Sequence, residues 1–415
     1  MSTGRGPHDV LIGRQSIFGR DGSVVAYELL FRSTRKNVAH VSDDTRATAR
    51  IIVDTLMEGG LGKILGGKRG FVNIGPDFLL EDALFLLPPR DLVLEILETV
   101  PVTDATVSRC RELRSRGYTL ALDDYVGRED IWAPLLETVS IVKVDILAVP
   151  EPDLRPVVQR LHARKLSLLA EKVETPEQLA RTMEMGFDYF QGFFFARPVI
   201  LASRKVDPLR QAVTGVLAMV LADAGTDEIV RAVRPHIDLS ASLIRIANVV
   251  GLSPFHAVTD IRQAVLAMGT DQIRRWLEII LFSSSLSDSR YARPVLQMAV
   301  TRARLMELLA QSWTGPGKPE PEEAFLVGMF SLSEPLLGVS VSEMLEGLPL
   351  REEVRKALLR GEGSLGHLLA FASNLDRSGD SLERLMGDLP VPVERIVWSQ
   401  TQSLLWGDDI VRIFS

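Results

Sequence analysis

Two short stretches decide the fold: Thr119–Tyr125, which reads TLALDDY, and Ile141–Asp145, which reads IVKVD. Each is an apolar run that contains or ends in charged residues. Similar runs alternate with longer helical patterns from Val10 to about Pro198, and Asp44–Met57 and Pro176–Met185 are examples of those patterns. This alternation predicts βα units and a largely parallel sheet.

The number of apolar runs in this part of the chain predicts the architecture. About eight strands in about 190 residues are typical of a closed α/β barrel of the TIM type. The expected strands are Val10–Phe18, Val24–Phe31, Gly70–Ile74, Leu92–Leu97, Thr119–Tyr125, Ile141–Ile146, Leu166–Val173 and Tyr189–Phe193.

The strand pattern stops after Arg197. From Asp207 to Phe414 nearly every segment has apolar residues three and four apart, which predicts an all-α second domain. Leu239, Leu243 and Ile246, for example, share one helix face. We expect a flexible N-terminus at residues 1–9, the barrel at 10–200, the helical domain at 205–400 and a separate C-terminal segment at 401–415.

Composition limits the classes of function. The 415 residues are 46% hydrophobic and 24% charged, as in ordinary globular proteins, which excludes a disordered or fibrous chain. The net charge of -7 argues against DNA as a partner. The single cysteine, Cys110, excludes an intramolecular disulfide and a cysteine zinc site. A polar N-terminus and the lack of a long apolar stretch predict a cytoplasmic protein that contacts a membrane only through a partner.

Polar residues interrupt seven successive strands of the predicted barrel. They are Glu28, Asn73, Glu95, Asp123 with Asp124, Lys143 with Asp145, Glu171 and Gln191. In a parallel barrel the carboxyl ends of the strands meet at one mouth, where barrel enzymes have their active sites. One such residue is more often a hydrogen-bonded structural group, but seven in register predict a site.

The acidic residues of this set predict bound metal. Carboxylates around one mouth repel each other and raise one another's pKa unless cations neutralise them. Oxygen ligands without histidine or thiolate suit hard ions such as Mg²⁺ or Mn²⁺. The adjacent pair Asp123 and Asp124 suits a bridge between two ions that activate water for attack on a phosphodiester.

Residues 10–200 resemble an EAL domain, the barrel of cyclic di-GMP phosphodiesterases, in the divergent form of the YuxH-like group. The matching segments, in order, are Arg14–Phe18, Glu28–Arg32, Phe71–Asn73, Leu94–Glu98, Leu122–Tyr125, Val142–Asp145, Ala170–Glu174 and Tyr189–Phe193.

The resemblance implies a role for each polar residue. It makes Glu28, Asn73, Glu95 and Asp123 ligands of one metal, and it makes Asp123 and Asp124 ligands of a second. It implies that Lys143 positions the attacking water, that Glu171 steadies the catalytic loop and that Gln191 binds water. Gln15, Glu28 and Arg32 would contact the substrate, with Arg32 at a phosphate.

Several positions depart from the EAL pattern. Its loop after the aspartate pair has the form Phe-Gly-Thr-Gly-x-Ser. Here Tyr125–Asp130 reads YVGRED, which is shorter and lacks the small hydroxyl residues threonine and serine. Lys172 replaces a usual glycine, Leu29 replaces the alanine of the name-giving motif, and Gly75 stands where a hydroxyl residue is typical. We therefore expect a complete first metal site and a weakened second one. Lys172→Gly alone would not restore full activity, because the loop is also missing.

Residues 205–400 resemble an HDOD domain, a helical relative of the HD metal hydrolases without their metal ligands. The matching segments are Asp238–Asn248, Ile261–Gly269, Ile273–Leu277, Val300–Leu309 and Phe325–Leu332. None of the histidines of this half is followed by aspartate, so metal hydrolysis is not expected there. Arg262, Arg274 and Arg275 are expected on a solvated helix face.

The sequence thus predicts a signal-transduction protein. Its divergent EAL barrel would sense cyclic di-GMP or metal, or hydrolyse the dinucleotide weakly, and its HDOD domain would recruit a protein partner. Two alternatives remain: an active phosphodiesterase that uses Mg²⁺ or Mn²⁺ and yields the linear dinucleotide, and a structural scaffold that binds no ligand. A homodimer is compatible with each of these three hypotheses.

Overall fold

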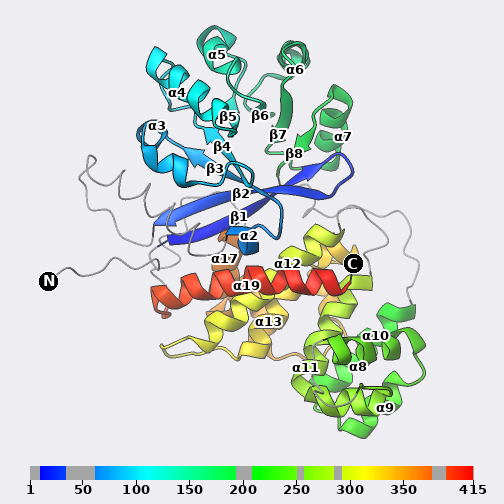
Figure 1. Ribbon diagram of the computed structural model, residues 1–415. Helices are drawn as coiled ribbons and strands as arrows, with labels where there is room; N and C mark the ends of the chain where they lie inside the picture. Colours follow the sequence, from blue (N-terminus) through cyan, green and yellow to red (C-terminus); the bar gives the residue numbers. More distant parts are fainter. Residues whose placement is uncertain are drawn as a thin grey trace, which may run out of the picture. The chain divides into compact units, whose positions relative to one another are not determined.

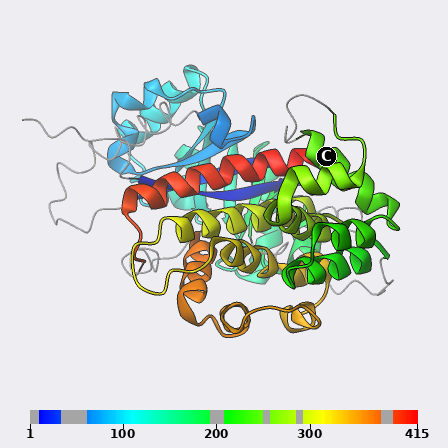
Figure 2. The same cartoon turned by 90° about the horizontal axis from the view of Figure 1, so that it is seen from below.

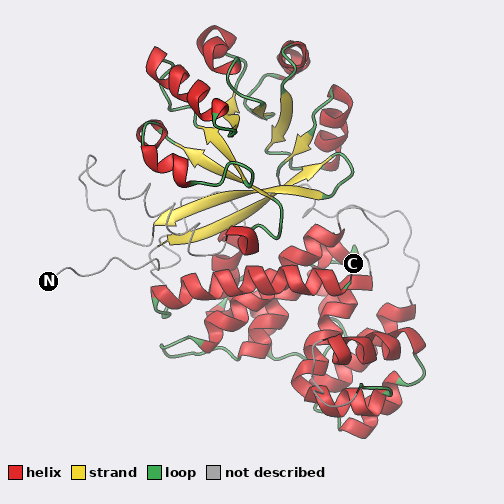
Figure 3. Cartoon of the chain, viewed as in Figure 1, coloured by secondary structure: helices red, strands yellow, loops and turns green. Residues whose placement is uncertain are grey.

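The computed structural model describes residues 10–33, 61–192, 208–249, 257–284, 292–375 and 389–414. The chain divides into two compact units, one with residues 10–192 and the other with residues 208–374 and 389–414 of the described ranges. Within those ranges, strands occur in the first unit and the second is helical (Figure 3). An α/β barrel followed by an all-α domain is thereby confirmed.

Eight strands close the barrel in chain order (Figure 1). They are β1 (Val10–Gly19), β2 (Val24–Ser33), β3 (Arg69–Ile74), β4 (Leu92–Ile96), β5 (Thr119–Tyr125), β6 (Ile141–Asp145), β7 (Ser167–Glu171) and β8 (Tyr189–Phe190). Strands β2 to β8 are parallel, but β1 is antiparallel to both β2 and β8. The tight turn at Arg20–Ser23 is the reason, because a turn of this length can join only antiparallel strands.

Helices surround the barrel on its outer side. They are α2 (Leu61–Ile64), α3 (Pro76–Leu79), the 3₁₀-helix η1 (Asp82–Leu86), α4 (Asp104–Ser115), α5 (Glu129–Leu136), α6 (Glu151–Ala163) and α7 (Pro176–Met185). Helices α4 and α7 each begin with a capping box, at Thr103 and Thr175, which satisfies free backbone N–H groups of the first turn. The predicted helix Asp44–Met57, the N-terminal residues 1–9 and Phe193 lie outside the described residues.

A layer of apolar side chains fills the inside of the barrel and forms the floor of its mouth. Its members are Ile17, Ala26, Phe71, Val93, Ala121, Ile141 and Leu169, with Tyr189 packed against them. On β2 to β8 a polar residue follows two positions later, and on the antiparallel β1 Gln15 precedes Ile17 by two. Because side chains alternate along a strand, these polar residues lie on the inner face, directly above the floor.

The second unit consists of packed helices. They are α8 (Pro208–Leu221), α9 (Thr226–Val233), α10 (Ile237–Val249), α11 (Ile261–Ser283), α12 (Ala292–Gln311), α13 (Pro321–Phe330), α14 (Ser333–Leu337), α15 (Val341–Leu345), α16 (Glu352–Arg360), α17 (Gly363–Leu375) and α19 (Val393–Ile413). Leu239, Leu243 and Ile246 are buried, as their spacing predicts. Helix α11 is broken at Gly269, where φ is 69° and ψ is 172°.

Helix α12 is the centre of this unit. Helices α13 and α19 pack along it, and α19 crosses residue 400 without a break, although we expected the domain to end there (Figures 1 and 2). A Cβ at Gly328 would lie 2.4 Å from Ala303 Cα, so only glycine permits the close approach of α13 to α12. None of the described helices is long and apolar enough to span a membrane.

The expected solvated face of arginines was wrong for two of the three residues. Arg262 is exposed, but Arg274 and Arg275 are mostly buried and form ion pairs with Glu278 and Glu307. Helix α11 is apolar on most of its circumference at this point, so its arginines need buried partners.

Candidate active site at the mouth of the barrel

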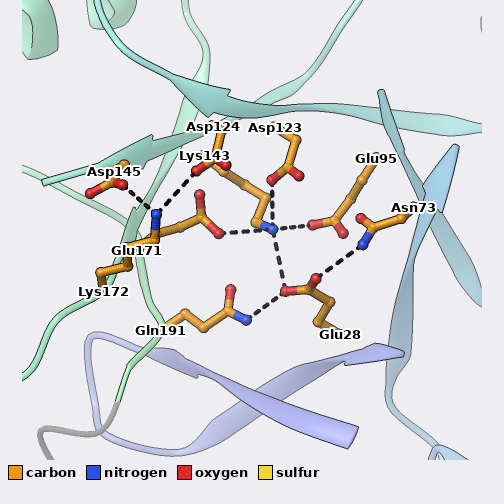
Figure 4. Close-up of polar contacts among 10 residues, drawn as sticks. All are labelled: Glu28, Asn73, Glu95, Asp123, Asp124, Lys143, Asp145, Glu171, Lys172 and Gln191. Atoms are coloured by element: carbon orange, nitrogen blue, oxygen red, sulfur yellow. Dashed lines mark hydrogen bonds and ion pairs between the residues drawn. The ribbon is translucent and has the colours of Figure 1, made fainter. Parts of the chain in front are cut away.

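Lys143 on β6 lies at the centre of the mouth, and its side chain is 1% exposed. Its Nζ is 2.8 Å from Glu95 Oε1, 2.8 Å from Asp123 Oδ1, 2.9 Å from Glu171 Oε1 and 3.3 Å from Glu28 Oε2 (Figure 4). Four strands thus direct a carboxylate at one ammonium group. Since one positive charge faces four acidic groups, the site is strongly acidic.

Two amides hold Glu28 in place. Asn73 on β3 donates a hydrogen bond to Glu28 Oε1 at 3.4 Å, and Gln191, directly after β8, donates one to Glu28 Oε2 at 2.6 Å. Four buried oxygens of the mouth, among the described residues, accept no hydrogen bond. They are Asn73 Oδ1, Gln191 Oε1, Glu95 Oε2 and Glu171 Oε2. Buried polar atoms without a partner are uncommon and point to a ligand that completes the site.

Burial and charge act in opposite directions on the acidic groups. Burial raises the pKa of Glu28, but Lys143 and the two amides outweigh it, so the pKa lies below its usual value. Burial and the charge of Glu28 raise the pKa of Glu95 well above the usual value. Burial also raises the pKa of Glu171, to about 8. The pKa of Lys143 is lowered by burial, but the four carboxylates outweigh this effect and raise it well above normal.

A bulge in β5 turns two adjacent aspartates toward the mouth. The pairing with β6 shifts between Leu122 and Tyr125, and Asp124 has a φ of 42°. In a regular strand Asp123 and Asp124 would point to opposite faces, and a bulge changes the direction of one side chain. Oxygens of Asp123, Asp124 and Glu98 all lie within 4.8 Å of one another. The pair predicted as a bridge is therefore brought together, and Glu98 joins it.

A second lysine lies beside this group. The ammonium of Lys172, which directly follows β7, contacts Asp145 at the end of β6 and is 3.7 Å from Asp124 Oδ1. Asp145 Oδ1 also accepts hydrogen bonds from the backbone N–H groups of Leu147, at 2.8 Å, and Ala148, at 3.1 Å. Asp145 is thus fixed by the start of the following loop.

Most of the predicted site residues meet in one place. Glu28, Asn73, Glu95, Asp123, Lys143, Glu171 and Gln191 form one connected group, and Asp124 lies next to it. Gln15 pairs with Glu28 in the β1–β2 register, which places it on the same inner face. Arg32 lies on β2, but its side chain is outside the described part of the chain.

Two residues of the mouth were not assigned a role from the sequence. Glu98 lies three residues beyond Glu95, after β4 has ended, so strand alternation could not place it. Asp145 is two residues beyond Lys143 and on the same strand face, which was a usable signal. Glu171 contacts Lys143, while its predicted role in steadying a loop remains a prediction.

The donor set fits a hard divalent cation. Every candidate ligand atom is a carboxylate or amide oxygen, which Mg²⁺, Mn²⁺ and Ca²⁺ prefer. The buried oxygens of Asn73, Glu95 and Glu171 that accept no hydrogen bond supply unused lone pairs within the described mouth. The charge also fits, because the excess of carboxylates over ammonium groups calls for further positive charge.

Comparison with known proteins is consistent with both domains. The sequence model of the EAL domain family matches residues 76–198, and the sequence model of the HDOD domain family matches residues 208–356. YuxH of Bacillus subtilis is 33% identical over 373 residues, which cover 88% of this chain and 90% of YuxH. CdgJ of Vibrio cholerae, a cyclic di-GMP phosphodiesterase, is 31% identical over 412 residues, which cover 97% of this chain and 93% of CdgJ.

One solved structure is similar to part of this chain. A standalone EAL protein from Vibrio cholerae O395, in its c-di-GMP-bound form, aligns with a TM-score of 0.39 and 21% identity over 46% of this chain and 92% of that protein. The full-length likeness to YuxH and CdgJ is decisive, because it spans the barrel and the helical domain in the same order. The chain belongs to the family of EAL–HDOD proteins that includes YuxH and CdgJ.

Proposed function

We propose that the barrel is a metal-dependent site that binds cyclic di-GMP and slowly opens one of its phosphodiester bonds. The observation that carries this proposal is the buried group of four carboxylates and two amides around Lys143. A scaffold without a ligand has no use for so many buried acidic groups, which are costly to desolvate. Likeness to the phosphodiesterase CdgJ over nearly the whole chain supports the same substrate.

The candidate metal ligands divide into two groups. Glu28, Asn73, Glu95 and Asp123 would hold one cation, and Asp123 with Asp124 would hold another. A divalent cation supplies two effects in such a site: it lowers the pKa of a water molecule and neutralises charge on the phosphodiester. The metal in this proposal is Mg²⁺ or Mn²⁺.

The protein's own groups orient the reactants. Lys143 would donate a hydrogen bond to the attacking water, because its ammonium already lies between the carboxylates of four strands. Gln191 fixes Glu28 through its 2.6 Å hydrogen bond, and its unused Oε1 is available to a water molecule. Gln15 and Arg32 would contact the dinucleotide, with Arg32 at a phosphate. Glu171 Oε1, 2.9 Å from Lys143 Nζ, helps to hold the ammonium in place.

Slow turnover follows from the loop after β5. Only Val126–Arg128 separate β5 from α5, so little chain is available to close over the second cation position. A misplacement of about 1 Å can cost about a hundredfold in rate. We expect the helical domain to pass the state of the barrel to a protein partner, in the cytoplasm, and a homodimer is compatible with this role.

The test is product formation from cyclic di-GMP with Mn²⁺ or Mg²⁺. Wild type should yield the linear dinucleotide, and Glu28→Gln should yield none, because it removes a charge from the centre of the site. Glu184→Gln, which changes an exposed glutamate on α7, is the matched control and should match wild type. Saturable binding without product would indicate a sensor, and neither binding nor product would contradict the proposal.

A further inference from the structure

Lys172 has an unusual backbone conformation at the edge of the mouth. It directly follows β7 and has a φ of 56°, in the left-handed region that favours glycine. A residue other than glycine is strained in this conformation. Its ammonium bridges Asp145, at the end of β6, and Asp124, on the β5 bulge. The strained backbone therefore directs a positive charge at two acidic residues.

Both partners of Lys172 are themselves held in place. The backbone N–H groups of Leu147 and Ala148 fix Asp145. Asp124 also has a left-handed backbone, with a φ of 42°. Two non-glycine residues with positive φ thus face each other across the end of β6. Such strain gathers at functional sites, where the surrounding structure maintains it.

Asp124 lies between one positive charge and a group of acidic oxygens. Its Oδ1 is 3.7 Å from Lys172 Nζ. A carboxylate oxygen of Asp124 also lies within 4.8 Å of oxygens of Asp123 and Glu98. A divalent cation on these oxygens would be close to the ammonium of Lys172.

We propose that Lys172 is a positioning residue that weakens the binding of a second divalent cation. Its ammonium pairs with Asp124 and Asp145 and repels a cation bound to Asp124. The first cation position, at Glu28, therefore fills well before the second, at Asp124. This inference rests on the proposed function, because it assumes that the first position, with Glu28 as a ligand, binds metal.

The size of the effect follows from charge and exposure. A unit charge and a divalent cation a few ångströms apart repel strongly, but the side chain of Lys172 is 51% exposed, and water screens the interaction. We expect about a tenfold weaker second binding step than in a protein without this ammonium, a size typical of one screened charge.

The experiment is a titration of the full chain with Mn²⁺ alone. Calorimetry records the heat of binding, and electron paramagnetic resonance measures free Mn²⁺. Lys172→Gly and Lys172→Asn both remove the charge, and both residues accept the left-handed backbone. Lys172→Arg keeps the charge. Lys165→Gly is the matched control, because Lys165 has a φ of 61° but lies before β7, at the opposite end of that strand.

The expected result is a second Mn²⁺ step that tightens about tenfold in the Gly and Asn variants and stays weak in the Arg and Lys165→Gly variants. The affinity of the second Mn²⁺ step could instead be equal in wild type and all four variants. That result would overturn the inference. One Mn²⁺ step in wild type, matched in Lys172→Gly without a second step, would overturn the inference and leave the proposed function standing. No binding by either protein would overturn both.

Discussion

At the scale of single residues, Lys143 determines the electrostatics of the mouth. A buried charge is stable only with partners, and this ammonium has four of them. The polar positions on seven strands were predictable, since each polar residue interrupts or ends an apolar run of the sequence. The central place of Lys143 was not predictable. Alternation along a strand determines which face a side chain lies on, but it does not determine where the end of a long side chain lies.

Lys143→Met should make the fold of the barrel depend on metal. Without the ammonium, the carboxylates of Glu28, Glu95 and Asp123 lose their counter-charge, and breaking such a buried pair costs about 3–5 kcal/mol. Thermal unfolding in EDTA should therefore show a lower Tm than wild type, and Mn²⁺ should raise the Tm of the variant more than that of wild type. Lys68→Met, at an exposed position, is the control. Equal Tm values in EDTA would contradict this account.

Lys172→Gly should raise hydrolysis at limiting Mn²⁺ by about tenfold at most, as expected from one screened charge. The short loop Val126–Arg128 stays unchanged, so full activity should not return. The rate of linear dinucleotide formation, measured beside CdgJ, checks this. A variant as fast as CdgJ would show that the loop is dispensable.

At the scale of elements, the local backbone positions the site. The strands were predictable from short apolar runs, but the β5 bulge was not, because a bulge adds one residue without a clear sequence signal. The pairing of Lys172 with Asp124 depends on that bulge and on a positive φ at each residue. The antiparallel direction of β1 could have been foreseen from the short turn Arg20–Ser23.

Gly192→Ala should disrupt the end of β8. Gly192 has a φ of 149°, and a Cβ there would lie 2.0 Å from the carbonyl oxygen of Val173. The segment must then move and take Gln191 away from Glu28. We expect a loss of about 3 kcal/mol in stability, as for other overpacked sites, and a loss of hydrolysis.

Gly75→Ala is the control for this substitution. Gly75 also lies directly beyond a site strand, but its φ is −78° and the nearest atom to a Cβ, Leu97 Cδ1, is 4.0 Å away. Thermal unfolding and product formation should stay near the wild-type values. If both glycine variants behaved alike, the account of β8 would be wrong.

Glu278 on α11 should make the stability of the helical domain depend on pH. Burial raises its pKa to about 7, against the opposing charges of Arg274 and Arg275 and with support from Glu307. Because the folded pKa lies above the ordinary value, the folded state binds the proton more tightly. The stabilising contribution is complete below about pH 4.5 and is lost as the pH rises through about 7.

Thermal unfolding of wild type and Glu278→Gln at two pH values checks this. Relative to the variant, wild type should lose about 1 kcal/mol between about pH 6 and about pH 8. Glu334→Gln, which changes an exposed glutamate of α14, should retain this pH dependence, since Glu278 and its neighbours are unchanged there. The same pH dependence in wild type and Glu278→Gln would rule out Glu278 as its source.

At the scale of the whole molecule, the sequence predicted both units because the hydrophobic period changes near residue 198. It also predicted most of the site, because seven strands carry polar residues in the same register. It could not place Glu98 at the mouth or predict buried partners for Arg274, because these depend on loops and helix packing. The family assignment rests on likeness across both units.

The most direct test of the central claim is the heat of binding when cyclic di-GMP is titrated into the purified full chain, once with Mn²⁺ and once with EDTA. We predict saturable binding with Mn²⁺ that is lost in EDTA and in Glu28→Gln, because the carboxylates around Lys143 repel the phosphates unless a cation neutralises them. Equal binding in EDTA, or no binding under either condition, would contradict the account of the barrel as a metal-dependent cyclic di-GMP site.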